Sequence, residues 1–94
     1  MKVLIIRTFP DVLNVNTYNV QEIGLAKALV KKGIECGVVL YNGKEADRTE
    51  NYSFTDEGKI YLFPIYWLKG VSLFKNGFMK SVYQLIPDYD VVQV

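Results

Sequence analysis

The feature that most constrains the fold is an almost continuous apolar run near the start of the chain, residues 2–8, KVLIIRT. A strand with apolar residues on both faces is typical of a parallel sheet that is covered on both sides. Pro10 ends the run, because proline has no N–H to donate to a neighbouring strand. The sequence therefore predicts that the chain opens with a buried strand.

A helix follows this strand and is the most clearly marked element of the sequence. Leu25, Ala26 and Leu29 form the apolar centre of one face at helical spacing. Gly33 supplies the left-handed residue that commonly ends a helix, and lysines crowd the last turn, where they favour the negative pole of the helix dipole. We expect a helix over about residues 17–32, with an asparagine or threonine cap at its start.

Three further segments have the pattern of strands: residues 34–41, 59–65 and 90–94. Pro64 is expected to end the regular pairing of the middle one. The polar and charged residues 44–58 lie between the first two, and we expect them to form a long loop or an irregular insertion.

A second helix is expected from about Ser72 or Asn76 to Ile86, which gives the element order β-α-β-β-α-β. Buried strands linked by helices imply a parallel sheet with right-handed crossovers. The sequence thus predicts an α/β fold, a three-layer Rossmann-like sheet in one domain over residues 1–94. Because the fourth strand runs to Val94, we expect only half of such a domain, with one wall of its cleft missing.

The composition excludes several classes of function. The 94 residues contain one cysteine, Cys36, and no histidine, so these residues form no internal disulfide, no Cys/His metal cluster and no Ser-His or Cys-His nucleophilic pair. A net charge of +1 gives no electrostatic footprint for nucleic acid. Cys36 stands in an apolar run and is interpreted as a buried small hydrophobe. We find no signal peptide and no membrane-spanning run, which predicts a cytoplasmic protein.

The candidate binding site is the loop after the first strand. In an open α/β sheet with strand order 3-2-1-4, ligands bind beyond the carboxyl ends of the first and fourth strands. The loop over this point, residues 9–19, has no glycine-rich dinucleotide fingerprint. Its amides and hydroxyls suit uncharged hydrogen bonds to the hydroxyls of a sugar acceptor. The candidate acceptor-binding residues are Thr8, Asn14, Asn16, Thr17, Tyr18 and Asn19. The alternative is that they are helix caps in an ordinary polar loop.

Two residues inside the first helix have simple structural interpretations. Glu22 complements the helix dipole and can form a capping box with Asn19, and no partner for it as a catalytic base is visible in the sequence. Gly24 costs about 1 kcal/mol relative to alanine in a helix interior, so we interpret it as a point of close packing.

An aromatic and basic stretch covers residues 61–83 and includes Trp67. It is interpreted as core, or as an interface with further chain. An aromatic and basic surface can also rest on anionic lipid headgroups. A peripheral membrane adaptor that uses Trp67 is therefore a weaker alternative.

Two passages resemble retaining glycosyltransferases of the GT-B fold (group 1, family 4 type). They are residues 21–36, QEIGLAKALVKKGIEC, and residues 89–94, YDVVQV, together with the opening MKVLII and Phe9-Pro10. Ile34 and Gln93 stand where that family usually has histidines, and an asparagine-rich loop replaces its glycine pair.

The resemblance implies an amino-terminal, acceptor-side segment and a separate, missing carboxyl-terminal domain that binds a UDP- or GDP-sugar. It implies transfer to a glycan or lipid-linked acceptor in bacterial surface polysaccharide synthesis, in the cytoplasm and at the inner face of the membrane. No catalytic residue is placed, no cofactor or metal is expected in this segment, and the segment alone is expected to be inactive and to self-associate through its truncated interface. The alternative function is a free-standing α/β binding or interaction module without catalysis.

Overall fold

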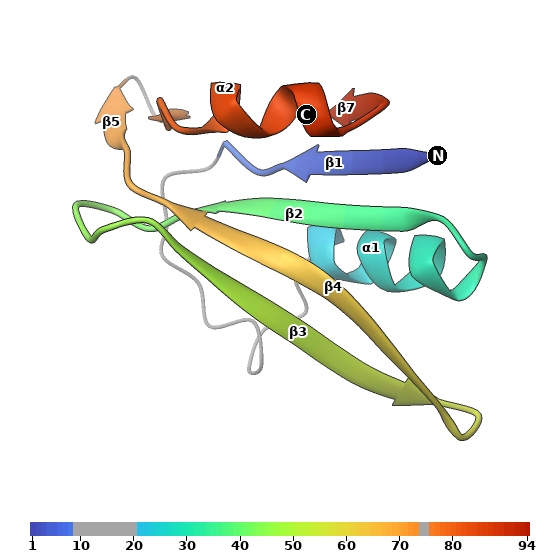
Figure 1. The fold of residues 1–94 in the computed structure, drawn as a ribbon. Helices are drawn as coiled ribbons and strands as arrows, with labels where there is room; N and C mark the ends of the chain where they lie inside the picture. The colour runs from blue at the N-terminus through green and yellow to red at the C-terminus, as the bar shows by residue number, and fades with distance from the viewer. Residues whose placement is uncertain (9–20, 74–75) are drawn as a thin grey trace.

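The computed structural model describes residues 1–8, 21–73 and 76–94 and shows an α/β protein built on a five-stranded sheet. The strand order is β3-β4-β2-β1-β7 (Figure 1). Four strands run parallel to one another: β1 (Lys2–Ile6), β2 (Glu35–Tyr41), β4 (Lys59–Leu68) and β7 (Val91–Gln93). The α/β class and the parallel pairing that the sequence predicted are confirmed.

β1 lies inside the sheet, with β2 on one side and the edge strand β7 on the other. Alternate residues of β1 enter two different cores, because successive side chains of a strand point to opposite faces. Val3 and Ile5 pack on the face covered by α1 (Gln21–Lys31), and Leu4 and Ile6 pack on the other face. This arrangement explains why β1 is apolar on both faces.

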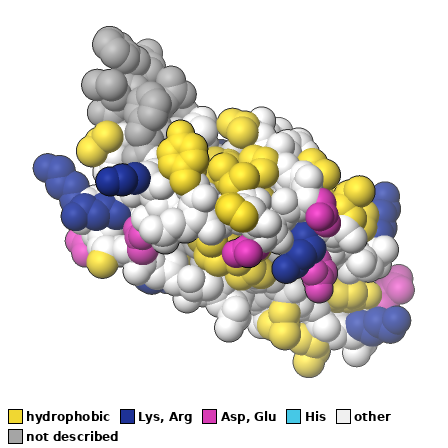
Figure 2. All heavy atoms as spheres, turned by 45° about the horizontal axis from the view of Figure 1, so that its top comes forward, with side chains coloured by type: hydrophobic (Ala, Val, Ile, Leu, Met, Phe, Trp, Pro, Cys, Tyr) yellow, Lys and Arg dark blue, Asp and Glu magenta, His cyan; other side chains and the backbone are white. Residues whose placement is uncertain are grey.

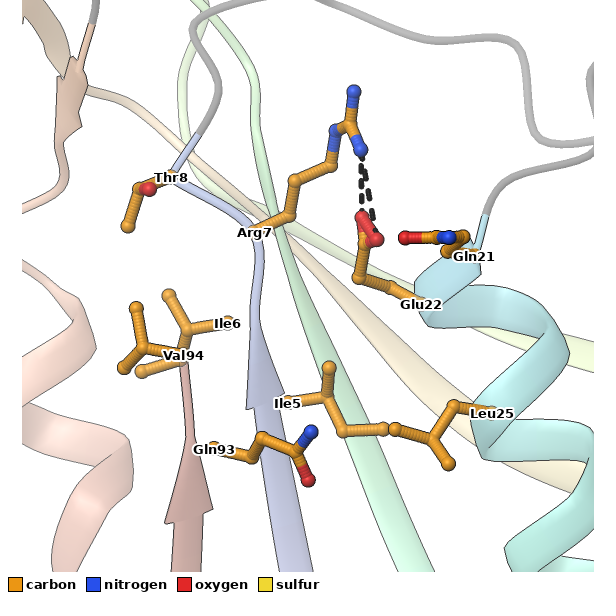
Figure 3. A pocket seen from close by; sticks show the side chains of 9 residues that line it. All are labelled: Ile5, Ile6, Arg7, Thr8, Gln21, Glu22, Leu25, Gln93 and Val94. Carbon is orange, nitrogen blue, oxygen red and sulfur yellow. Dashed lines mark hydrogen bonds and ion pairs between the residues drawn. The ribbon is translucent and has the colours of Figure 1, made fainter.

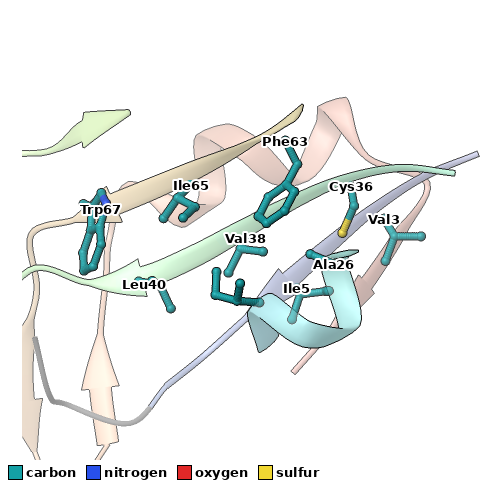
Figure 4. Packing of buried hydrophobic residues seen from close by; sticks show 10 residues of the cluster. Val3, Ile5, Ala26, Cys36, Val38, Leu40, Phe63, Ile65 and Trp67 are labelled. Carbon is teal, nitrogen blue, oxygen red and sulfur yellow. The ribbon is translucent and has the colours of Figure 1, made fainter. Parts of the chain in front are cut away.

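The core on the α1 side is the larger one (Figure 4). Ile23 and Ala26 of α1 press against the sheet and are 4% and 0% exposed. Complete burial of an isoleucine side chain such as that of Ile23 contributes about 1.5–3 kcal/mol. Cys36 is buried in the same core, as predicted, and burial raises the pKa of its thiol to about 11.

The end of α1 has the predicted geometry. Gly33 has a φ of 83°, in the left-handed region. Its N–H donates to the carbonyl of Val30, and the N–H of Ile34 donates to the carbonyl of Leu29. These two bonds form a Schellman motif, which satisfies carbonyls that the helix end leaves open. The predicted first turn of the helix lies outside the described residues.

The prediction of a loop over residues 44–58 is wrong. β3 (Arg48–Asp56) pairs antiparallel with β4 along its whole length, and Asp56 faces Lys59 across a two-residue turn. Glu57 and Gly58 in this turn have φ values of 51° and 80°, as a type I′ hairpin turn requires. β3 was missed because its exposed alternate residues are polar, and polar character alone resembles a loop.

β4 is longer than predicted, and Pro64 does not end it. Pro64 faces Asn51 of β3, and the pairing of β4 with β2 begins at the next residue, Ile65. The proline therefore precedes the residues of β4 that have a strand on each side. Trp67, farther along β4, is 2% exposed and donates from Nε1 to Glu50 at 3.0 Å. Its burial contradicts a membrane contact made by Trp67.

The prediction of a helix from about Ser72 or Asn76 to Ile86 is also wrong. β5 (Val71–Leu73) and β6 (Asn76–Phe78) form a small antiparallel pair, and only α2 (Val82–Leu85) and the 3₁₀ helix η1 (Ile86–Asp88) follow. Asn-Gly at 76–77 favours a turn or strand end over a helix interior. α2 and η1 pack on the face of the sheet opposite α1 (Figure 1).

Gly24 does not mark close packing, which corrects the interpretation made from the sequence. The residue is exposed, and a Cβ added to it meets no atom within 4 Å. Gly37 of β2 is the glycine that close packing requires. A Cβ there would lie 2.3 Å from the hydroxyl of Tyr89.

Candidate functional site

A pocket of about 330 Å³ opens at the carboxyl ends of β1 and β7, beside the first turn of α1 (Figure 3). The pocket lies at the point in the sheet where the strand order reverses. From β1 the chain crosses to β2 on one side, and it returns to β1 on the other side as β7. Its lining residues are Ile5, Ile6, Arg7, Thr8, Gln21, Glu22, Leu25, Gln93 and Val94.

An ion pair forms one wall of this pocket. Arg7 directly follows β1, and its backbone N–H donates to the carbonyl of Val39 at 3.1 Å, which anchors the residue to β2. The Nη1 of Arg7 donates to Oε1 of Glu22 at 2.6 Å, and the two side chains are only 26% and 15% exposed. A partly buried, charge-assisted bond of this kind holds both groups in one position.

The other polar groups of the pocket are uncharged. Thr8 contributes a hydroxyl, and Gln21 and Gln93 contribute side-chain amides from α1 and β7. Hydroxyls and amides both donate and accept hydrogen bonds, whereas a carboxylate only accepts them. Ile5 and Leu25 supply the apolar floor. A few polar groups above an apolar floor are typical of a site that orients a small polar ligand.

Of the candidate residues named from the sequence, the structure places Thr8 in this pocket. The other five, Asn14, Asn16, Thr17, Tyr18 and Asn19, lie outside the described residues, so their role stays a prediction.

Sequence reasoning missed the contributions of Arg7 and Gln93. Glu22 was interpreted as a dipole and capping residue, but it has a charged partner fifteen positions away in the sequence. The available signal was position: a charged residue just after a buried strand, and an opposite charge in the first turn of the next helix.

A second, larger hollow lies on the α2 side of the sheet and has a volume of about 1120 Å³. Its apolar lining includes Met79, Val82, Ile86 and Val92. Lys44, Lys69 and Lys80 also line it. Figure 2 shows the face on which α2 and β7 lie, with hydrophobic side chains gathered at its centre and basic side chains toward both ends.

One carboxylate ties the loops around this hollow together. Asp47 accepts from the hydroxyl of Ser81 at 2.5 Å and from the backbone N–H of Lys69 at 2.6 Å. These two bonds, that of Ser81 foremost, hold the pKa of Asp47 below its usual range. Asp47 therefore joins the β2–β3 and β4–β5 connections to the start of α2.

Two other types of site find no support in the part of the chain that the structure describes. There, no three acidic, cysteine or histidine side chains come together as a metal would need. None of its helices has the length and apolar character needed to cross a bilayer.

No family model, no curated protein and no solved structure matches this chain. The fold and the pocket geometry therefore have to carry the functional argument.

Proposed function

We propose that the chain is the acceptor-side part of a GT-B glycosyltransferase, with a Rossmann-like sheet whose β1/β7 pocket holds the sugar acceptor. The observation that carries this proposal is the pocket at the carboxyl ends of β1 and β7, the two strands between which the strand order reverses. Open α/β sheets bind their ligands at such switch points. The resemblance of residues 21–36 and 89–94 to this enzyme class adds support from the sequence.

The chemistry of the pocket favours an acceptor over a nucleotide. The loop after β1 has no glycine for close approach to a pyrophosphate. Thr8 and Gln93 offer uncharged hydrogen bonds, and Glu22, positioned by Arg7, offers a carboxylate that accepts from sugar hydroxyls. In this proposal the UDP- or GDP-sugar binds to a separate domain, and the acceptor is a glycan or lipid-linked sugar of bacterial surface polysaccharide synthesis at the cytoplasmic face of the membrane.

The free edge of β7 supports the idea that further chain completes the pocket. Val91 and Val92 of β7 point to opposite faces of the sheet and are 42% and 37% exposed, and Val94, just after the strand, is 83% exposed. A strand that is apolar on both faces normally lies inside a parallel sheet. We therefore propose that another strand covers β7 in the whole enzyme and supplies the second wall of the pocket.

The test is a nuclear magnetic resonance titration of the isotope-labelled 94-residue chain with neutral oligosaccharides and, separately, with UDP- and GDP-sugars. We expect the oligosaccharides to shift the amide signals of Arg7, Thr8 and Gln93, and the nucleotide-sugars to leave them unchanged. Glu22→Gln should weaken these shifts. Glu35→Gln is the matched control, because Glu35 is exposed and lies at the opposite end of β2.

Nucleotide-sugar binding in this pocket, or oligosaccharide shifts confined to other residues, would contradict the acceptor role. Sugar transfer by the 94 residues alone would contradict the proposal that a second domain is needed. Oligosaccharide binding by a chain that needs no further domain would instead favour the free-standing binding module.

A further inference from the structure

We propose that a second copy of this chain pairs with the open edge of β3, antiparallel and around a two-fold axis that places Tyr52 opposite Tyr52 of the second copy. This inference does not depend on the sugar-transfer proposal. It rests on the openness of the β3 edge and on the order of charges along that strand.

Of the features that usually protect an edge strand, β3 has charged residues but lacks the others. β3 is the last strand of the sheet, and its pairing with β4 runs through nine consecutive residues without a bulge. It contains neither proline nor lysine. Edge strands are normally kept apart by bulges, prolines, lysines or short length. Figure 1 shows the β3–β4 ribbon extending past the rest of the sheet, so a partner strand can approach it.

The charges of β3 are complementary to those of a second, antiparallel copy. Arg48 begins the strand and Asp56 ends it. An even separation along a strand puts two residues on the same face, so both side chains lie on the face that α1 covers. When Tyr52 faces Tyr52 of the second copy, each Arg48 stands opposite an Asp56. Opposite charges in directly facing positions stabilise a strand pair, and like charges destabilise it.

The remaining pairs of this register are also compatible. Thr49 faces Thr55 and Asn51 faces Ser53, so the exposed face pairs small polar groups that can hydrogen-bond to each other. Glu50 faces Phe54, and no like charges meet. Shifting the register so that Ser53 lies on the axis would place Glu50 opposite Asp56, two negative charges. The charge order therefore favours the register centred on Tyr52 over the one centred on Ser53.

Contacts within each copy fix the positions of the residues that would face each other in this register. Arg48 lies over the ring of Trp67 with Cζ 4.8 Å from the centroid and reaches Glu50 of its own strand at 3.5 Å, and Asp56 pairs with Lys31 at 2.8 Å. Both charged side chains stay accessible, at 56% and 40% exposure. The ring of Tyr52 packs against the ring of Phe63, and the two centroids are 5.1 Å apart. Pairing through Tyr52 would join the aromatic clusters of the two copies across the axis.

The test is sedimentation of the full chain and its charge variants over a concentration series. We expect the native chain to form a dimer, twice the 10.8 kDa of one copy. Arg48→Asp and Asp56→Arg should each weaken it at least about tenfold, because each places like charges opposite one another twice per dimer. An equimolar mixture of the two variants should regain the dimer, since every facing pair is then one arginine and one aspartate. A misfolded variant could not be rescued by mixing.

A chain that stays monomeric at every concentration would overturn the proposal. So would a mixture that associates no better than its components. Val94→Lys is the matched control at the other edge of the sheet, where Val94 is 83% exposed. It should leave the dimer unchanged, and dissociation by Val94→Lys would place the association at β7 instead.

Discussion

The two edges of the sheet are built in opposite ways. β3 has nine residues, alternates exposed polar with half-buried side chains, and carries a charge at each end. β7 has three residues, which are exposed although two of them are valines. Within residues 1–8, 21–73 and 76–94, neither edge has a further strand beside it to pair with its outer backbone N–H and C=O groups.

This contrast shows that a strand at an open edge can be of two physically different kinds. A strand with polar residues on its exposed face, such as β3, can remain in water, and it pairs with a partner through its backbone. A strand with valines on both faces, such as β7, gains little from its side chains until other elements cover them. We therefore interpret β3 as an edge suited to water or to a second copy, and β7 as an edge whose valines favour cover by another element.

The largest predicted effect is on the β7 side. Gly37→Ala would place a Cβ 2.3 Å from the hydroxyl of Tyr89, which bonds Tyr66 at 2.8 Å and precedes β7. We expect a loss of about 2–3 kcal/mol in the free energy of unfolding, the upper part of the range for overpacking. Hydrogen exchange should quicken at the β7 amides and stay unchanged in β3.

Adding Tyr89→Phe should recover part of this loss, because it removes the atom that the new Cβ meets. A Gly37→Ala variant as stable as the native chain, or one that loosens β3 and β7 equally, would break the contrast between the two edges.

The second prediction concerns the buried core beneath the central strands, between the two edges. Burial raises the pKa of the Cys36 thiol from its ordinary 9.0 to about 11. The unfolded chain therefore loses this proton first, and stability should fall as the pH rises from about 9 to about 11, by up to about 2–3 kcal/mol, and then level off. Denaturation curves of the native chain and of Cys36→Ala over this pH range measure the difference.

The extra loss at high pH should be absent in Cys36→Ala. If fraying of either edge exposed the thiol, Cys36 would react with thiol reagents at neutral pH in the folded chain, contrary to this account.

The third effect tests the wall of the β1/β7 pocket. Glu22→Gln and Arg7→Met should each cost about 1–2 kcal/mol, because each removes the charge-assisted bond of a partly buried ion pair. The double variant should cost less than the sum of the two single variants. A double-mutant cycle by chemical denaturation gives the coupling, and strictly additive losses would show that the pair does not act as a unit.

The smallest effect is a gain. Gly24→Ala in α1 should stabilise the chain by about 0.5–1 kcal/mol, because an added Cβ meets nothing within 4 Å and alanine favours the helix. Thermal unfolding measures it. A destabilised variant would indicate that Gly24 contacts a second copy or another part of the whole protein.

The sequence predicted the elements whose signals are local. Both-face apolar runs marked β1, β2 and β7, and Gly33 marked the end of α1 through its left-handed backbone. β3 was missed because an edge strand needs apolar residues on only one face, and because its turn uses Glu57-Gly58 rather than the usual Asn-Gly or Asp-Gly.

The pocket was predictable in position and not in composition. The switch-point rule needs only the strand order, which the sequence pattern suggested. The Arg7–Glu22 pair needs the three-dimensional proximity of the end of β1 and the first turn of α1, which the positions of the two charges in the sequence allow but do not require. Gln93 enters the pocket only because β7 lies beside β1.

The most direct test of the central claim is nuclear magnetic resonance measurement of proton–proton contacts between β1 and β7. We expect backbone contacts in which residue numbers rise together along both strands, with Val3 next to Val91, Leu4 next to Val92 and Ile5 next to Gln93. That order places the carboxyl ends of both strands at one pocket. Contacts in descending order, or none between these strands, would remove the switch point and contradict the proposed acceptor site.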